Sequence, residues 1–203
     1  MLPLLKSPHV IIALLCATTA AFAIGFIESL LELHLEKFSL SINSIGLCFL
    51  AMSATYTAST IATGWITDMR FRPWSICSFG LLLILIAFLL IGPLPFLPLP
   101  PSLSLTIMGL VLQGSGSAAV LVSSYSCSIT STLKIDGYGE GLATYSIVSG
   151  VWTSAFALGN FLGPTVAGVL FDQVCKSISR KFKVDFLRSA SLGVVFQWFC
   201  WQG

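Results

Sequence analysis

Long apolar runs separated by short polar or proline-rich stretches dominate this chain of 203 residues. A helix rises about 1.5 Å per residue, so about 20 apolar residues are needed to cross the hydrocarbon core of a bilayer. Five runs reach or approach this length, and they cover residues 10–35, 42–66, 74–91, 103–130 and 142–171. The pattern therefore predicts five membrane-spanning helices, of which the fourth and fifth are long enough to require tilting or kinking.

The connections between the runs are short, and the one at residues 92–101 contains five prolines, which exclude a helix there. Short loops make sequential helices antiparallel neighbours, so an up-and-down bundle is expected. A last apolar run, residues 186–201, is strongly apolar only from 194 to 201, which is too short to span. We therefore divide the chain into a membrane domain, residues 1–173, and a divergent tail with an incomplete sixth hydrophobic segment, residues 174–203.

The composition supports a membrane protein. Hydrophobic residues make up 56% of the chain and charged residues 9%, against about 25% charged residues in a soluble domain. The mean hydropathy is +0.94 and the net charge is only +2, which gives no indication of a nucleic-acid partner. The six cysteines have no Cys-x-x-Cys spacing, and most lie in apolar runs, so reduced, buried thiols are expected. No nucleotide-binding loop, metal-ligand set or catalytic triad is present in the sequence, which predicts neither an enzyme nor a cofactor.

Basic residues in the short loops predict the orientation. Lys6, Arg70, Arg72 and Lys134 would lie on one side of the membrane and Lys37 on the other, which places the amino terminus in the cytoplasm. Five basic residues in the tail, at positions 176, 180, 181, 183 and 188, oppose this count. We rely on the loops, because helices hold both of their ends.

The tight turn between the second and third runs carries several charges, in the sequence Gly-Trp-Ile-Thr-Asp-Met-Arg-Phe-Arg-Pro from Gly64. Gly64 permits close approach of a neighbouring helix, and Asp68 can face a helix amino terminus, whose free N–H groups favour an anion. Arg70 and Arg72 would lie at the membrane surface. The alternative is a simple cytoplasmic anchor with one incidental aspartate.

A second motif lies in the fifth run, in the sequence Gly-Asn-Phe-Leu-Gly-Pro-Thr-Val-Ala-Gly from Gly159. Gly159 and Gly163 belong to a series of small residues spaced four apart, which makes a smooth face for close packing. Pro164 removes a backbone hydrogen bond and is expected to kink the helix, and Gly168 follows it. Such a helix would let two bundles rock against each other, whereas the alternative is an ordinary small-residue packing helix.

Together, the turn and this second motif, about 90 residues apart, resemble the carboxyl-terminal half of a major facilitator transporter. The stretch Gly-Phe-Ile-Glu-Ser-Leu-Leu from Gly25 is similar to the seventh helix of vesicular amine transporters. Residues 35–38 and 139–142 are similar to the polyamine-type branch. The resemblance implies helices seven to eleven of a twelve-helix fold, that is, a partial six-helix half, with substrate bound between two halves. It also implies exchange of lumenal protons for cytoplasmic organic cations.

The sequence departs from this family at two places. Ser29 stands where the family has a proline, and acidic residues typical of the tenth and eleventh helices of the monoamine branch are missing. A polyamine-type substrate therefore fits better than a monoamine.

Glu28 is the residue that we expect to couple protons to substrate. A carboxylate within a membrane helix is costly and indicates a functional site, and it can exchange a proton for a cation. Glu32 lies one turn further along on the same face and Glu36 one more, so the three can form an acidic ladder. Alternatively, Glu32 and Glu36 are ordinary interfacial acids, with Glu36 paired to Lys37.

Two functions are consistent with these features. The first is part of a proton-coupled antiporter that loads a small organic cation, such as a polyamine, into secretory or synaptic vesicles or another acidic organelle. Its partners would be the lipid bilayer and an amino-terminal six-helix half or another transporter chain, because a substrate cleft needs both halves. The second is a non-transporting half-bundle that binds and modulates a full-length transporter.

Overall fold

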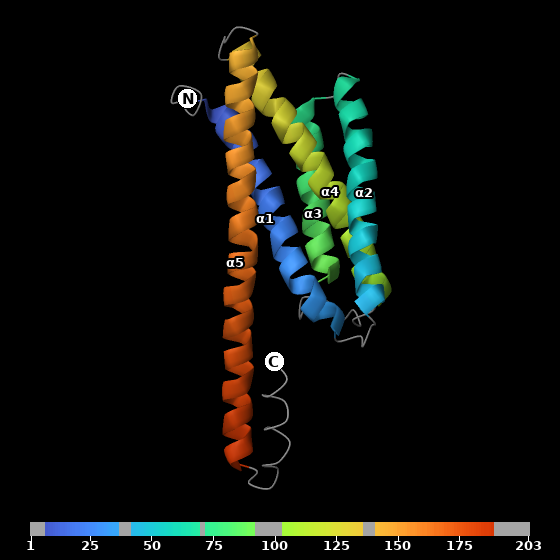
Figure 1. Ribbon diagram of the computed structural model, residues 1–203, viewed down its shortest axis with the longest axis vertical. Helices are drawn as coiled ribbons and strands as arrows, with labels where there is room; N and C mark the ends of the chain where they lie inside the picture. The colour runs from blue at the N-terminus through green and yellow to red at the C-terminus, as the bar shows by residue number, and fades with distance from the viewer. Residues whose placement is uncertain (1–6, 37–41, 70–71, 92–102, 136–140, 189–203) are drawn as a thin grey trace. The chain divides into compact units, whose positions relative to one another are not determined.

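The computed structural model describes residues 7–36, 42–69, 72–91, 103–135 and 141–188 (Figure 1). The described residues form five α-helices and one π-helical turn. The α-helices are α1 (Pro8–Glu36), α2 (Ile42–Asp68), α3 (Pro73–Ile91), α4 (Leu103–Thr130) and α5 (Leu142–Arg188), and the π-helix η2 (Ser131–Ile135) continues α4. All five α-helices are long and apolar enough to cross a membrane, which confirms the predicted all-α membrane fold.

The fifth helix is longer than predicted. Its apolar part ends at Asp172, but the helix continues to Arg188 and so includes half of the predicted tail. No proline or glycine occurs between Gly168 and Arg188, so nothing in the local sequence stops the helix. The apolar segment 194–201 lies outside the described residues. By contact density, the chain divides into two compact units, Met1–Pro164 and Thr165–Gly203.

Within the first unit, α4 is the central helix and packs against α1, α2 and α3. Two glycines allow its close approach to two neighbours at once. A Cβ added at Gly114 would lie 2.7 Å from the carbonyl oxygen of Met52 in α2, and one at Gly116 would lie 2.9 Å from that of Gly80 in α3. The small residues that follow Gln113 therefore pack the helix tightly, and α4 continues through them.

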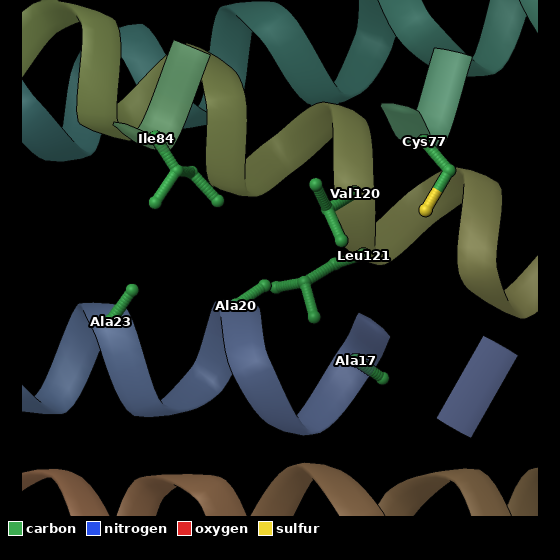
Figure 2. Packing of buried hydrophobic residues seen from close by; sticks show 7 residues of the cluster. All are labelled: Ala17, Ala20, Ala23, Cys77, Ile84, Val120 and Leu121. Atoms are coloured by element: carbon green, nitrogen blue, oxygen red, sulfur yellow. The ribbon is translucent and has the colours of Figure 1, made fainter. Parts of the chain in front are cut away.

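Alanines of α1 form the surface with which this helix contacts α3 and α4. Ala17, Ala20 and Ala23 are buried in one cluster with residues of α3 and α4. Figure 2 shows Leu121 extending from α4 toward Ala20. Small side chains let two helix backbones approach closely in lipid, where van der Waals contact supplies much of the association energy.

Many serine and threonine hydroxyl groups inside the spans donate to a carbonyl oxygen of their own helix. The Oγ1 atoms of Thr57 and Thr60 donate to carbonyl oxygens four residues earlier, at 2.9 Å and 2.8 Å. Hydrocarbon offers no hydrogen-bonding partner, so such internal bonds allow serine and threonine to be tolerated in a spanning helix.

Candidate functional site

Glu28 lies on the outer face of α1. Its neighbours Ile27 and Leu31 are buried with Met52 and Leu110, whereas the Glu28 carboxylate is exposed. Helix α1 continues to Glu36, so Glu28 lies eight residues, or about 12 Å along the axis, before the end of this helix. No described helix encloses this side chain, so it is available to a ligand or to another segment.

Ser29 maintains the helix beside this carboxylate. Its Oγ donates to the carbonyl oxygen of Gly25 at 2.8 Å, and α1 continues without interruption to Glu36. A proline at this position would remove the backbone N–H of this residue. Serine therefore leaves the backbone ladder at Glu28 intact. Glu32 lies in the same helix, but its side chain is outside the described residues.

Gly25 connects the turn of α1 that precedes Glu28 to the proline of α5. A Cβ at Gly25 would lie 2.9 Å from Cδ of Pro164 and 3.3 Å from the carbonyl oxygen of Asn160. Asn160 is four residues before Pro164, so its carbonyl is the one that loses its backbone donor to the proline ring. The absence of a side chain at Gly25 lets α1 approach this freed carbonyl, where a weak Cα–H···O contact is favourable.

Gly159 and Gly163 bring α5 against α1 within the same bundle. A Cβ at Gly163 would lie 2.6 Å from the carbonyl oxygen of Phe22, and one at Gly159 would overlap the carbonyl oxygen of Thr18. Thr18 Oγ1 also donates to the carbonyl oxygen of Ala155 at 3.1 Å. The predicted smooth face thus packs α5 on α1. The described contacts of these two glycines are all with α1, and none is with a second bundle. Gly168 has no described atom within 4 Å of an added Cβ.

The charged turn has fewer described contacts. Asp68 is the last residue of α2 and is exposed, and the backbone N–H of Ser75 donates to the carbonyl oxygen of Arg72 at 3.0 Å where α3 begins. No described atom lies within 4 Å of a Cβ added at Gly64, so the expected close helix approach is not found there. Arg70 lies outside the described residues.

An aromatic group between α4 and α5 is the feature that the sequence indicated least clearly. The rings of Tyr125 and Trp152 meet edge to face with centroids 5.5 Å apart, and Trp152 stacks on Phe156 at 5.7 Å. Two hydrogen bonds fix the rings, from Trp152 Nε1 to Ser124 Oγ at 3.1 Å and between Tyr125 Oη and Ser149 Oγ at 2.8 Å. The spacing of three and four residues between Ser149, Trp152 and Phe156 was the available signal, because it places them on one face of α5.

Gln113 is the largest of the fully buried polar side chains of α4. Its Nε2 donates to Ser117 Oγ at 3.2 Å, while its Oε1 has no partner. The cysteines Cys16, Cys48, Cys77 and Cys127 are free, as expected for reduced thiols. Among the described residues no group of three or more potential ligands could hold a metal ion.

The fold and composition define an integral, multi-pass, all-helical membrane protein. No family model and no solved structure matches the chain. Over 153 residues, however, the chain is 33% identical to the MFS-type transporter SLC18B1 of Homo sapiens and 30% identical to those of Rattus norvegicus and Mus musculus.

Each alignment covers 74% of this chain and 33% of the relative, so the chain spans about a third of the length of the curated relatives it matches. Over this region the chain is a major facilitator sequence related to the SLC18B1 transporters. The predicted family is therefore confirmed, and so is the prediction of a non-enzymatic chain, because these relatives are transporters.

Proposed function

We propose that this chain supplies transmembrane helices to a major facilitator transporter that exchanges protons for an organic cation, such as a polyamine, across the membrane of an acidic organelle. The observation that carries the proposal is Glu28. Asp68 is the last residue of α2, whereas Glu28 lies inside the span of α1 and its side chain is exposed. An ionisable group at such a position is costly unless it serves a function.

In this proposal Glu28 binds either a proton or the cationic substrate, so that one leaves when the other arrives. Glu32, one turn further along α1, receives the ion on the path to the membrane surface. The packing of Gly25 on Pro164 gives a physical route by which a change at Glu28 reaches α5, because Gly25 lies one helical turn from Glu28. Asp68, Arg70 and Arg72 form the charged turn between α2 and α3, which lies on the cytoplasmic side in this proposal.

The exposed side of α2 supports a second helical bundle as the partner. Only 11% of its span is buried, and Ser53, Ala54, Thr57 and Ala58 are exposed on it. Small and hydroxylated residues are typical of helix–helix interfaces in lipid and give little advantage against acyl chains. The partner in this proposal is an amino-terminal half with the complementary helices.

The experiment is proton-driven spermine uptake into vesicles that contain the full chain together with the part of the human relative that precedes the matched region. We expect Glu28→Gln to reduce uptake at least tenfold, because an amide cannot exchange a proton, and Glu28→Asp to retain part of it. Glu36→Gln, on the same helix, is the matched control and is expected to leave uptake unchanged. Equal uptake by the wild-type chain and Glu28→Gln, at equal expression, would refute the proposal.

A second candidate function is that of a half-bundle that binds a full-length transporter through α2 and modulates it. The same exposed face of α2 favours this reading. The test is co-purification with the intact human relative. If Glu28→Gln does not weaken this complex, and if the complemented vesicles show no spermine uptake, the modulating half-bundle is favoured over the antiporter.

A further inference from the structure

Cysteines from three different helices gather inside the bundle. Cys16 lies in α1, Cys77 in α3 and Cys127 in α4. Cys16 packs against the alanine-rich core that contains Cys77, and the thiols of these two residues lie within hydrogen-bonding reach of each other. Figure 2 shows the Cys77 thiol pointing from α3 toward the α1 side of this core, where Ala17 lies. The fold therefore places two thiols side by side that are about 60 residues apart in the chain.

This pair lies near one end of the two helices. One span separates α1 from α3, so both helices begin on the same side of the membrane, and the rings of His9 and Trp74 in their first turns have centroids 6.2 Å apart. Cys16 is eight residues, or about 12 Å, beyond the start of α1, and Cys77 is four residues, or about 6 Å, beyond the start of α3. A small molecule entering from this side therefore has only a short path to the pair.

The two thiols differ in exposure, and this difference assigns them different roles. Cys16 is half-buried, whereas Cys77 is only 2% exposed. A thiol reacts where a reagent can reach it, and a fully buried thiol is inert. Oxidation-sensitive cysteines are accessible and have a second, resolving cysteine beside them. Cys16 is therefore the thiol that meets an oxidant first, and Cys77 is the resolving thiol.

We propose that Cys16 and Cys77 form a redox-sensitive thiol pair, which a membrane-permeant peroxide converts into a disulfide between α1 and α3. The Cys16 sulfur attacks one peroxide oxygen, so an S–O bond forms and the O–O bond breaks. The other oxygen leaves as an alcohol, or as water, with the proton of the Cys16 thiol. The Cys77 sulfur then attacks the Cys16 sulfenic acid, an S–S bond forms, and the hydroxyl leaves as water with the Cys77 proton. The two sulfurs together lose two electrons, which the peroxide accepts.

The disulfide would change the mechanical properties of the bundle. It encloses about 60 residues, including the whole of α2, and it ties α1 to α3 near the end where both begin. A cross-link of this kind restricts the unfolded chain more than the folded one, so the oxidised protein should unfold at a higher concentration of denaturing detergent. The thiol pair does not depend on which substrate the protein carries.

The test uses the full chain in nanodiscs treated with tert-butyl hydroperoxide. The remaining thiols are blocked with N-ethylmaleimide, the protein is digested without reduction, and the peptides are identified by mass spectrometry. We expect a peptide that links Cys16 to Cys77, and we expect dithiothreitol to remove the link. Brief treatment of the untreated protein with N-ethylmaleimide is expected to label Cys16 before Cys77.

Cys77→Ala is expected to leave Cys16 as a sulfenic acid that dimedone traps, because the resolving thiol is missing. Cys48→Ala is the matched control, since Cys48 is a buried cysteine of α2 in a different cluster, and it is expected to leave the link unchanged. The linked peptide is detected in the unaltered chain, so the test does not depend on whether a variant folds. No link after peroxide, a link from Cys16 to Cys127 or to a second chain, or labelling of Cys77 before Cys16 would overturn the proposal.

Discussion

Replacing Gly163 by alanine tests the contact between α1 and α5 directly. The added Cβ would lie 2.6 Å from the carbonyl oxygen of Phe22 and 2.8 Å from the backbone nitrogen of Phe26. Ordinary carbon contacts begin near 3.4 Å, so the two helices must separate by about 0.8 Å. Because the obstructing atoms belong to the backbone, no side-chain rotation can relieve the overlap.

The cost follows from this separation. A gap of 0.5–1 Å forfeits about a quarter to a half of each dispersion contact along the interface, and overpacking of this kind costs about 1–3 kcal/mol. We therefore expect Gly163→Ala to lower the free energy of unfolding by that amount. The measurement is unfolding of the reconstituted protein by titration with a denaturing detergent, followed by the fluorescence of Trp152 in a variant whose other tryptophans are phenylalanine.

The matched control is Gly150→Ala, in the same helix, where no described atom lies within 4 Å of the added Cβ. This substitution is expected to be neutral or slightly stabilising, because alanine is the better helix former. Equal unfolding free energies for the two alanine variants would show that α1 and α5 do not pack through Gly163.

Three further substitutions test other contacts. Gly25→Ala is expected to destabilise the protein by about 1–3 kcal/mol, because its Cβ meets the Pro164 ring, whereas Gly46→Ala, which meets no described atom, is the control in the same detergent titration. Tyr125→Phe removes the bond to the half-buried Ser149 hydroxyl and is expected to cost about 1 kcal/mol; an unchanged unfolding midpoint would contradict that bond. Gln113→Leu removes a buried oxygen that has no partner and is expected to change stability by less than about 1 kcal/mol, so a larger loss would mean that an unseen partner satisfies it.

The sequence determined which segments are helices and which of them can cross a membrane. Transfer of a helix into lipid is a sum over its own residues, so the apolar runs predicted all five spans without any tertiary information. The exposed Glu28, a charge within one of these spans, was recognisable for the same reason. The end of α5 was missed, because loss of hydrophobicity after Asp172 was taken to end the helix, although no residue there breaks it.

Only the tertiary structure decided which faces of the helices meet. The small residues of α5 were visible in the sequence, but their contact with Thr18 and Phe22 of α1 depends on residues about 140 positions away. The sequence likewise contained Tyr125 and Trp152 as separate aromatic residues, and their assembly into one group required α4 and α5 to lie side by side. Lipid tails are as apolar as the side chains of the helices, so the hydrophobic pattern cannot distinguish a lipid-facing from a helix-facing surface, and shape complementarity between distant segments makes that choice.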